Sequence, residues 1–184
     1  MANISGRGGS VLHGGTSEVT GSSDTIPLYK LGTRATDESG NEYLYVDFQE
    51  AFLATEWCVI GASFAASQLQ STSKGPVGIV CGTASASDRW GWVQIYGAAD
   101  GLATTDVTTG ASRLVVSATT DQGHVDSSTS AGGLIVHGAF CQSLGTTATT
   151  PATALTSSFQ VCGFWLNYPY VNGIAESVSS GEST

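Results

Sequence analysis

The chain has 184 residues, of which 41% are hydrophobic and 11% are charged, and its formal net charge is −9 at pH 7. Its six basic residues are scattered, which argues against nucleic-acid binding, because that binding depends on Lys and Arg neutralising phosphates. Twenty-four glycines and few charged residues favour short strands and turns over helices. We therefore predict an all-β fold, an antiparallel β-barrel or β-sandwich with an extended N-terminal arm.

The arm is predicted over residues 1–26, where glycine, serine and threonine dominate and the apolar residues follow no period. Such a segment buries too little apolar surface to offset its ordering entropy, so we expect it to be disordered or to order only on a partner. No signal-peptide region and no run long enough to span a bilayer occurs, so we expect cytoplasmic folding and no membrane partner. The expected binding residues of the arm are its spaced apolar side chains and its one cation: Ile4, Arg7, Val11, Leu12, Val19 and Ile26.

A single β-rich domain is predicted over residues 27–173, followed by a frayed tail over residues 174–184. The clearest strand is Tyr43–Phe48, where apolar residues alternate with a period of two. The stretch Ala62–Gln70 fits a helix and an extended segment equally well. Further candidate strands, separated by clusters of Gly, Asp, Ser or Thr, are Glu56–Ile60, Val77–Cys81, Trp90–Tyr96, Arg113–Ser117, Leu134–Phe140 and Phe159–Asn167.

The sequence WGWVQIYG, which begins at Trp90, carries an unusual density of aromatic residues. On a strand, Val93 and Ile95 share one face, which suits a barrel interior, while Trp90, Trp92 and Tyr96 share the other. Aromatic side chains with polar tips are enriched at protein interfaces, so these three residues are the predicted oligomer interface. Two alternatives remain open: a strand buried on both faces, and a platform that binds carbohydrate.

The cysteines indicate no metal site. None of the four belongs to a CxxC pair, and each lies in an apolar neighbourhood. We expect them to be free, buried thiols that pack as small hydrophobic groups in a reducing cytoplasm. They are Cys58, Cys81, Cys141 and Cys162.

No complete catalytic set emerges from the polar residues. The sequence DQGHVD, from Asp121 to Asp126, has the residue types of a metal site but is more typical of a turn. Asp47 and Glu50 would point to opposite faces of a strand, which argues against a glycosidase pair. His137 lies in an apolar strand and is expected in a core or an interface. We therefore predict no enzyme activity, no metal and no cofactor.

Several stretches together resemble a known family. LGTRATDESGNEYLYVDFQEA and GIVCGTASASDRWGWVQIYG resemble two blocks of small virion proteins of tailed bacteriophages, and the strand Arg113–Ser117, the turn GHVD and the closing NYPYVNG follow in the same order. Over residues 27–173 the chain is similar to capsid decoration, or cement, proteins. The resemblance implies a structural protein on the virion, often a homotrimer, assembled in the host cytoplasm.

The resemblance also implies the mode of action and the partner. Capsid decoration proteins bind the outer surface of a phage head and stabilise the shell by clamping neighbouring capsomers, so the expected partner is the major capsid protein. A flexible arm on each subunit of a trimer would add avidity. The alternative is a phage head fibre or surface adhesin that binds carbohydrate through the aromatic strand.

Overall fold

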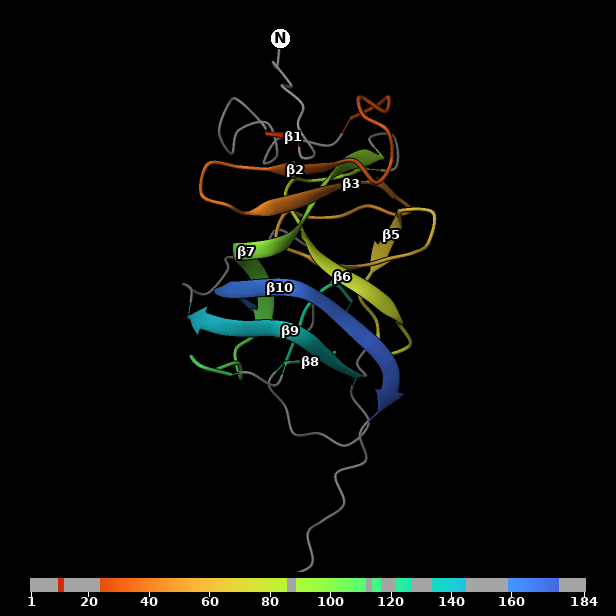
Figure 1. Cartoon of the computed structure of the whole chain (residues 1–184). Coiled ribbons are helices and arrows are strands. Elements are labelled where there is room, and N and C mark those ends of the chain that lie inside the picture. The colour runs from red at the N-terminus through yellow and green to blue at the C-terminus, as the bar shows by residue number, and fades with distance from the viewer. Residues whose placement is uncertain are drawn as a thin grey trace, which may run out of the picture.

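The computed structural model describes residues 10–11, 24–85, 89–111, 114–116, 122–126, 134–144 and 159–175, and of residues 10–11 and 173–175 it describes the backbone alone. Strands account for all the regular structure in these ranges, which confirms the all-β prediction (Figure 1). No helix able to cross a membrane lies in the described ranges. The strands are β1 (Ser10–Val11), β2 (Arg34–Thr36), β3 (Glu42–Phe48), β4 (Trp57–Ile60), β5 (Ala65–Gln68), β6 (Gly75–Val80), β7 (Trp90–Thr104), β8 (Leu114–Val116), β9 (Leu134–Ser143) and β10 (Phe159–Ala175).

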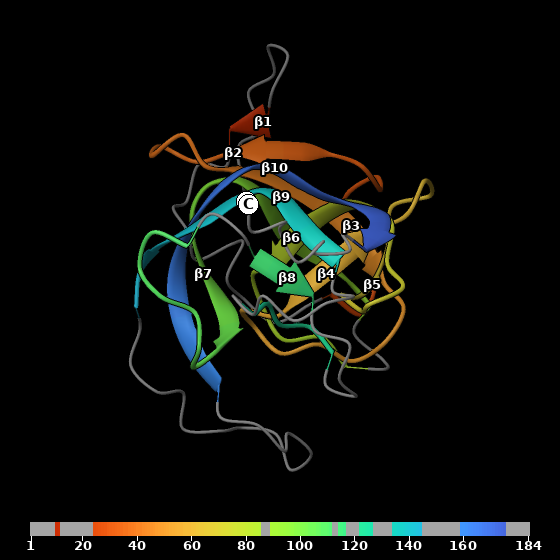
Figure 2. The same cartoon turned by 90° about the horizontal axis from the view of Figure 1, so that it is seen from below.

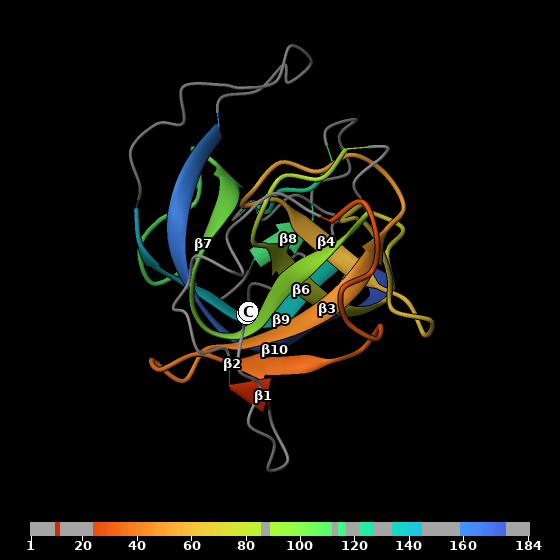
Figure 3. The same ribbon diagram turned by 90° about the horizontal axis from the view of Figure 1, so that it is seen from above.

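Five of the strands close into a ring. β3 pairs with β5 and β7, β4 connects β5 to β6, and β6 pairs with β7; the β3–β5 pair is parallel and the other four are antiparallel. Figures 2 and 3, which view the molecule from below and from above, show β1 and β2 along the outer side of β3. Alternate side chains fill the ring, as a small barrel requires. This barrel core contains Leu44, Val46, Phe48, Phe52, Cys58, Ile60, Ala66, Val80, Ala84, Val93 and Ile95, so the predicted inward face of Val93 and Ile95 is confirmed.

The second half of β7 leaves the ring and forms another layer. It pairs with β10, β10 pairs with β9, and β9 pairs with β8, all antiparallel (Figure 1). This layer covers a second core in which Trp57 lies edge-on to Phe164, with ring centroids 5.1 Å apart. The Trp57 indole N–H donates a 3.0 Å hydrogen bond to the Leu102 carbonyl. The polar atom of the largest fully buried side chain therefore has a hydrogen-bond partner.

β10 changes its neighbour part-way along its length. Asn167 is its last residue opposite β7, and Tyr170 is opposite Pro76 of β6. Between the registered pairs with β9, the three residues 167–169 of β10 face the single residue Gly138. Tyr168 takes a φ of 47° and Gly138 a φ of 76° in this bulge. Bulges redirect side chains, and here Tyr168 becomes 44% exposed.

The stretch Ala62–Gln70, which fitted a helix and an extended segment equally well, is extended, because it contains β5. The predicted arm differs from the expectation in one respect: Val11 lies in β1, which pairs in parallel with β2 of the same chain. Asp24, which also falls within the predicted arm, exchanges two backbone hydrogen bonds with Trp90. The division into arm, domain and tail otherwise stays a prediction. Outside the described residues lie Ile4, Arg7, Leu12, Val19 and the tail from residue 176.

Candidate functional site

The aromatic strand WGWVQIYG is largely internal. Trp92 is 6% exposed and packs against Tyr29 and Tyr45, with ring centroids 5.2 and 5.1 Å away. For Trp92 the interpretation of a strand buried on both faces is therefore correct. The expectation that Trp92 lies on an exposed face was wrong, because the neighbouring rings cover it. Tyr29 covers it because the preceding segment folds back, with the Leu28 amide donating to the Tyr45 hydroxyl at 3.1 Å. Trp90 and Tyr96 are half-buried, and their interface role stays a prediction.

An aromatic surface nevertheless lies on the outside of β7, β9 and β10. Tyr96 of β7 contacts Trp165 and Tyr168 of β10, with ring centroids 6.0 and 5.2 Å apart, and Trp165 is registered opposite Phe140 of β9. Phe140 and Tyr168 are 40% and 44% exposed. We call Tyr96, Phe140, Trp165 and Tyr168 the outer aromatic face. Sequence reasoning found Tyr96 alone, although the alternation Phe164–Trp165–Leu166 already indicated that Trp165 points away from the core.

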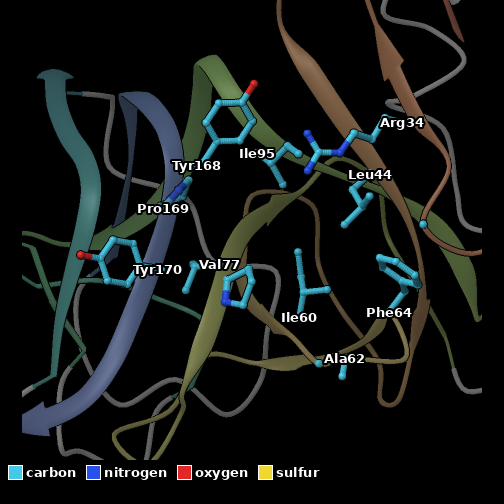
Figure 4. Close-up of a pocket in the computed structure, with 13 residues that line it drawn as sticks. Arg34, Leu44, Ile60, Ala62, Phe64, Val77, Ile95, Tyr168, Pro169 and Tyr170 are labelled. Carbon is cyan, nitrogen blue, oxygen red and sulfur yellow. The ribbon is translucent and has the colours of Figure 1, made fainter. Parts of the chain in front are cut away.

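Beside this face, the barrel opens into an apolar groove with a cavity volume of about 710 Å³ (Figure 4). Its floor is formed by barrel and second-core side chains, among them Leu44, Ile60 and Val77. Phe64 and Tyr170 stand at its sides and are 37% and 48% exposed. The mouth of a barrel is a common place for a binding site, and a volume of this size suits a small ligand or one peptide segment.

Two side chains of the groove are held by uncommon backbone conformations. Phe64 has a φ of 61° in the turn between β4 and β5, and Tyr168 has a φ of 47° in the β10 bulge. Positive φ is rare for bulky residues and is typical of binding and catalytic sites. Phe64 also depends on Gly32, because a Cβ at that position would overlap its ring. The surrounding fold therefore fixes both aromatic rings at the groove.

Arg34 and Tyr168 line the groove, and both contact the nearby carboxylate of Glu42. The Arg34 guanidinium lies 3.7 Å from the Glu42 carboxylate and 5.8 Å from the centroid of the Tyr168 ring. The Tyr168 hydroxyl donates a 2.9 Å hydrogen bond to Glu42, and this bond raises the pKa of Tyr168. Figure 4 shows the Arg34 side chain reaching from β2 toward Ile95 and Tyr168. The Arg34 cation is thus paired with Glu42 beside the groove, and the floor of the groove is aliphatic.

The chain matches no family model, no curated protein and no solved structure. The resemblance to capsid decoration proteins therefore rests on the sequence blocks alone.

The polar residues weighed for catalysis are engaged in contacts within the fold. The Arg89 guanidinium binds Asp47 at 3.0 Å, and the Glu50 carboxylate accepts a 2.6 Å hydrogen bond from the Gln68 amide. His137 stacks on Tyr170, with ring centroids 4.9 Å apart. Within the described ranges no three His, Cys, Asp or Glu side chains are grouped as a metal site would need.

All four cysteines are free, as predicted. Cys58, Cys141 and Cys162 are buried, whereas Cys81 is half-buried, so burial is confirmed for three of them. Burial raises the pKa of the Cys81 thiol to about 12 and that of Cys141 to about 11. Both groups are therefore neutral thiols at pH 7 and poor nucleophiles.

Proposed function

We propose that this protein is a structural virion protein, a capsid decoration protein that binds the outer surface of a phage head as a homotrimer and stabilises the shell. Its partner is the major capsid protein. The observation that carries the proposal is the outer aromatic face, because it offers a surface for association rather than a set of reacting groups. The sequence blocks that resemble decoration proteins support a phage head as the assembly.

Self-association is supported by the exposure and chemistry of the outer aromatic face. Its four rings come from three adjacent strands, so they form one continuous surface on a stiff sheet. Aromatic side chains are enriched at protein interfaces, and monomers rarely leave large apolar patches in water. We therefore assign the trimer contact to Tyr96 together with Phe140, Trp165 and Tyr168, in place of the stripe that included Trp92.

Contact with the capsid is supported by two exposed apolar side chains where the arm joins the domain. Ile26 is 65% exposed and Leu28 is 61% exposed. Their backbone is fixed on both sides, because Tyr45 donates a 2.6 Å hydrogen bond to Asp24 and accepts one from the Leu28 amide. Such presentation lowers the entropic cost of binding a partner.

The test separates the two surfaces. The double variant Phe140→Ser/Trp165→Ser is expected to be a monomer by light scattering at about 10 μM, a concentration at which a weak interface dissociates. The double variant Ile26→Ser/Leu28→Ser is expected to remain a trimer but to co-sediment poorly with phage heads stripped of their decoration protein. Leu144→Ser, which changes another exposed apolar residue, serves as the control and should behave as the wild type.

A wild-type protein that is monomeric and does not sediment with heads would reject the proposal. The carbohydrate alternative relied on Trp90, Trp92 and Tyr96 as one exposed stripe. Because Trp92 is buried, these three residues do not form a continuous exposed platform for a sugar.

A further inference from the structure

We infer that Cys141 and Cys162 form a redox-responsive pair, which a low-molecular-weight disulfide converts from two free thiols into a disulfide bond that joins β9 to β10. This modification site goes beyond the proposed function and does not rest on it, since it concerns the subunit alone. It gives the two buried thiols of the second core a role besides packing.

The two side chains meet where β9 ends and β10 begins. Cys141 is near the end of β9 and Cys162 is near the start of β10, and these antiparallel strands are direct neighbours (Figure 1). Both side chains are fully buried in the second core. A side-chain hydrogen bond links the two thiols, and the Cys141 thiol also donates a 3.6 Å hydrogen bond to the Ser143 carbonyl. The two sulfur atoms are therefore neighbours in the folded chain.

The backbone at this place permits the close approach that a disulfide needs. Cys141 is registered opposite Phe164, so Cys162 is its diagonal neighbour. In a regular ladder such neighbours are about 7–8 Å apart, whereas disulfides usually join Cα atoms about 4.4–6.8 Å apart. Here β9 has one extra residue, and a Cβ at Gly163 would lie 2.5 Å from the Ser143 hydroxyl oxygen. The irregular ladder and the missing side chain let the strand ends shift toward each other.

The other two cysteines lack this arrangement. Cys58 belongs to the barrel core, whereas Cys81 packs on a separate cluster that contains Trp92. The Cys58 thiol donates to the Gly78 carbonyl at 3.6 Å, and the Cys81 thiol donates to the Ile79 carbonyl at 3.7 Å. A bond between these two cysteines would require one side chain to leave its own cluster. They therefore serve as an internal comparison for the pair in the second core.

The reaction is a thiol–disulfide exchange. One cysteine attacks, as a thiolate, a sulfur of the small disulfide RSSR, so that a mixed disulfide forms and RSH leaves. The other cysteine attacks the protein sulfur of the mixed disulfide, and the second RSH leaves. Two protein thiols are oxidised, RSSR is reduced, and both hydrogens end on the released thiols. Because burial raises the pKa of Cys141 to about 11, the exchange is slow in the closed fold and proceeds by local opening of the strand ends.

The disulfide fastens the strand that covers the second core. β10 pairs with β7 and β9, and it carries Phe164 and Leu166 of that core. A cross-link between β9 and β10 restricts the unfolded chain, because it closes a loop of about twenty residues. We expect the oxidised protein to unfold at a temperature at least about 3 °C above that of the reduced protein.

The experiment treats the folded full-length protein with hydroxyethyl disulfide, quenches it with acid and labels the remaining thiols with N-ethylmaleimide in denaturant. Trypsin then releases Cys141 and Cys162 together in the peptide 114–184, whereas Cys58 and Cys81 fall in two other peptides. By mass spectrometry, the peptide 114–184 is expected to be unlabelled and lighter by two hydrogen atoms than its reduced form. Oxidation of Cys58 and Cys81 is expected to be at least about tenfold slower, because neither has a thiol partner to complete the exchange.

Three variants identify the bond. Cys141→Ala and Cys162→Ala each remove one partner, so treatment should raise the unfolding temperature of neither. Cys58→Ala removes an equally buried thiol outside the pair and is the matched control, in which the bond should still form.

The peptide map of the wild type decides the inference without any variant. Two labelled cysteines in the peptide 114–184 after treatment would overturn it, and so would equal oxidation rates for all four cysteines. A bond that forms only in urea, or that joins two chains, would also contradict it. Phage heads are absent from this experiment, so its outcome is independent of capsid binding.

Discussion

At the scale of single residues, Asp37 closes the turn between β2 and β3 with its own side chain. Its carboxylate accepts 2.9 Å hydrogen bonds from the Ser39 and Asn41 amides and a 2.8 Å hydrogen bond from the Tyr43 hydroxyl. Burial opposes the ionised form, but these hydrogen bonds outweigh it and lower the pKa of Asp37. The turn cluster was visible in the sequence, whereas the distant donor Tyr43 depended on the pairing of the two strands.

Glu56 is the opposite case. It is 6% exposed, and its carboxylate accepts hydrogen bonds from the Leu53 amide at 3.0 Å and from the Gln68 side chain at 3.3 Å. Burial raises the pKa of Glu56, and the charge of Glu50 acts in the same direction. Folding therefore favours the protonated form of this side chain.

We expect Glu56→Gln to weaken the pH dependence of stability. Because the folded pKa lies above the ordinary value of 4.5, the contribution of Glu56 is complete below that pH and is lost as the pH rises through the folded pKa. Glutamine keeps an acceptor for the Leu53 amide without a charge. The variant should therefore unfold at a higher temperature than the wild type at pH 7, and at pH 4.5 the difference should shrink. Thermal unfolding followed by circular dichroism measures both, and an equal difference at the two pH values would contradict the assignment.

At the scale of elements, strands with alternating apolar residues could be predicted from the sequence. Strands that form only because a neighbouring strand pairs with them could not. Tyr43–Phe48 was found because its apolar residues repeat with a period of two. The second half of β7 reads GAADGLAT after Tyr96, which has little strand propensity, and it is a strand because β10 pairs with it along its whole length. β2 has three residues, which is too short for a periodic signal.

The bulge of β10 depends on Gly138. Its φ is 76°, and a Cβ at this position would lie 2.6 Å from the Asn167 carbonyl oxygen. A backbone atom cannot move aside as a flexible side chain can. Gly40 has nearly the same φ, 82°, but no atom lies within 4 Å of the place where its Cβ would be. An alanine at Gly40 would therefore meet only the cost of the left-handed backbone conformation, whereas an alanine at Gly138 would also meet a steric clash.

We expect Gly138→Ala to destabilise the protein clearly more than Gly40→Ala. The left-handed conformation alone costs about 1–2 kcal/mol for alanine, so Gly40→Ala should lose about that amount of unfolding free energy. Gly138→Ala should lose more, and it should also alter the environment of Tyr168, because the bulge has to shift. Urea unfolding of both variants tests this. Similar losses would show that the contact with the Asn167 carbonyl relaxes without cost.

At the scale of the whole molecule, the two cores share the same strands. Val80 of β6 belongs to the barrel core, whereas Ile79 belongs to the second core. On β7, Val93 faces the barrel core and Ala103 lies in the second core. β6 and β7 therefore contribute side chains to both cores. Loss of one core would expose apolar surface on strands that also form the other core. We expect a single unfolding unit.

The variant Phe164→Ala tests that expectation. Phe164 is fully buried against Trp57, and truncation of such a phenylalanine costs about 3–5 kcal/mol. Although the change lies in the second core, far-ultraviolet circular dichroism and tryptophan fluorescence should shift together to the same lower midpoint. Two separate transitions, with the barrel retained in the second, would show that the layers unfold independently.

The groove could not be predicted from the sequence, because its residues are distant in the chain and meet only when the strands pair. Its side chains come from β2, β3, β4 and the turn after it, β6, β7 and β10, and no local pattern links Phe64 to Tyr168. The outer aromatic face has the same origin, since Tyr96 and Trp165 meet through the register of β7 with β10. Composition predicted the fold class, and strand pairing determined both surfaces.

The position of β10 as the last strand in the described part of the chain also affects the order in which the fold can form. The pairs that close the ring involve no residue after Tyr96, whereas the second core contains Phe164, Leu166 and Val171. During synthesis the strands of the ring leave the ribosome before β10, since the chain is made from its N-terminal end. A nascent chain that ends before β10 would display the apolar face of Val77 and Ile79 without its cover. Pairing of β10, a strand of seventeen residues, is therefore expected to cover this apolar face.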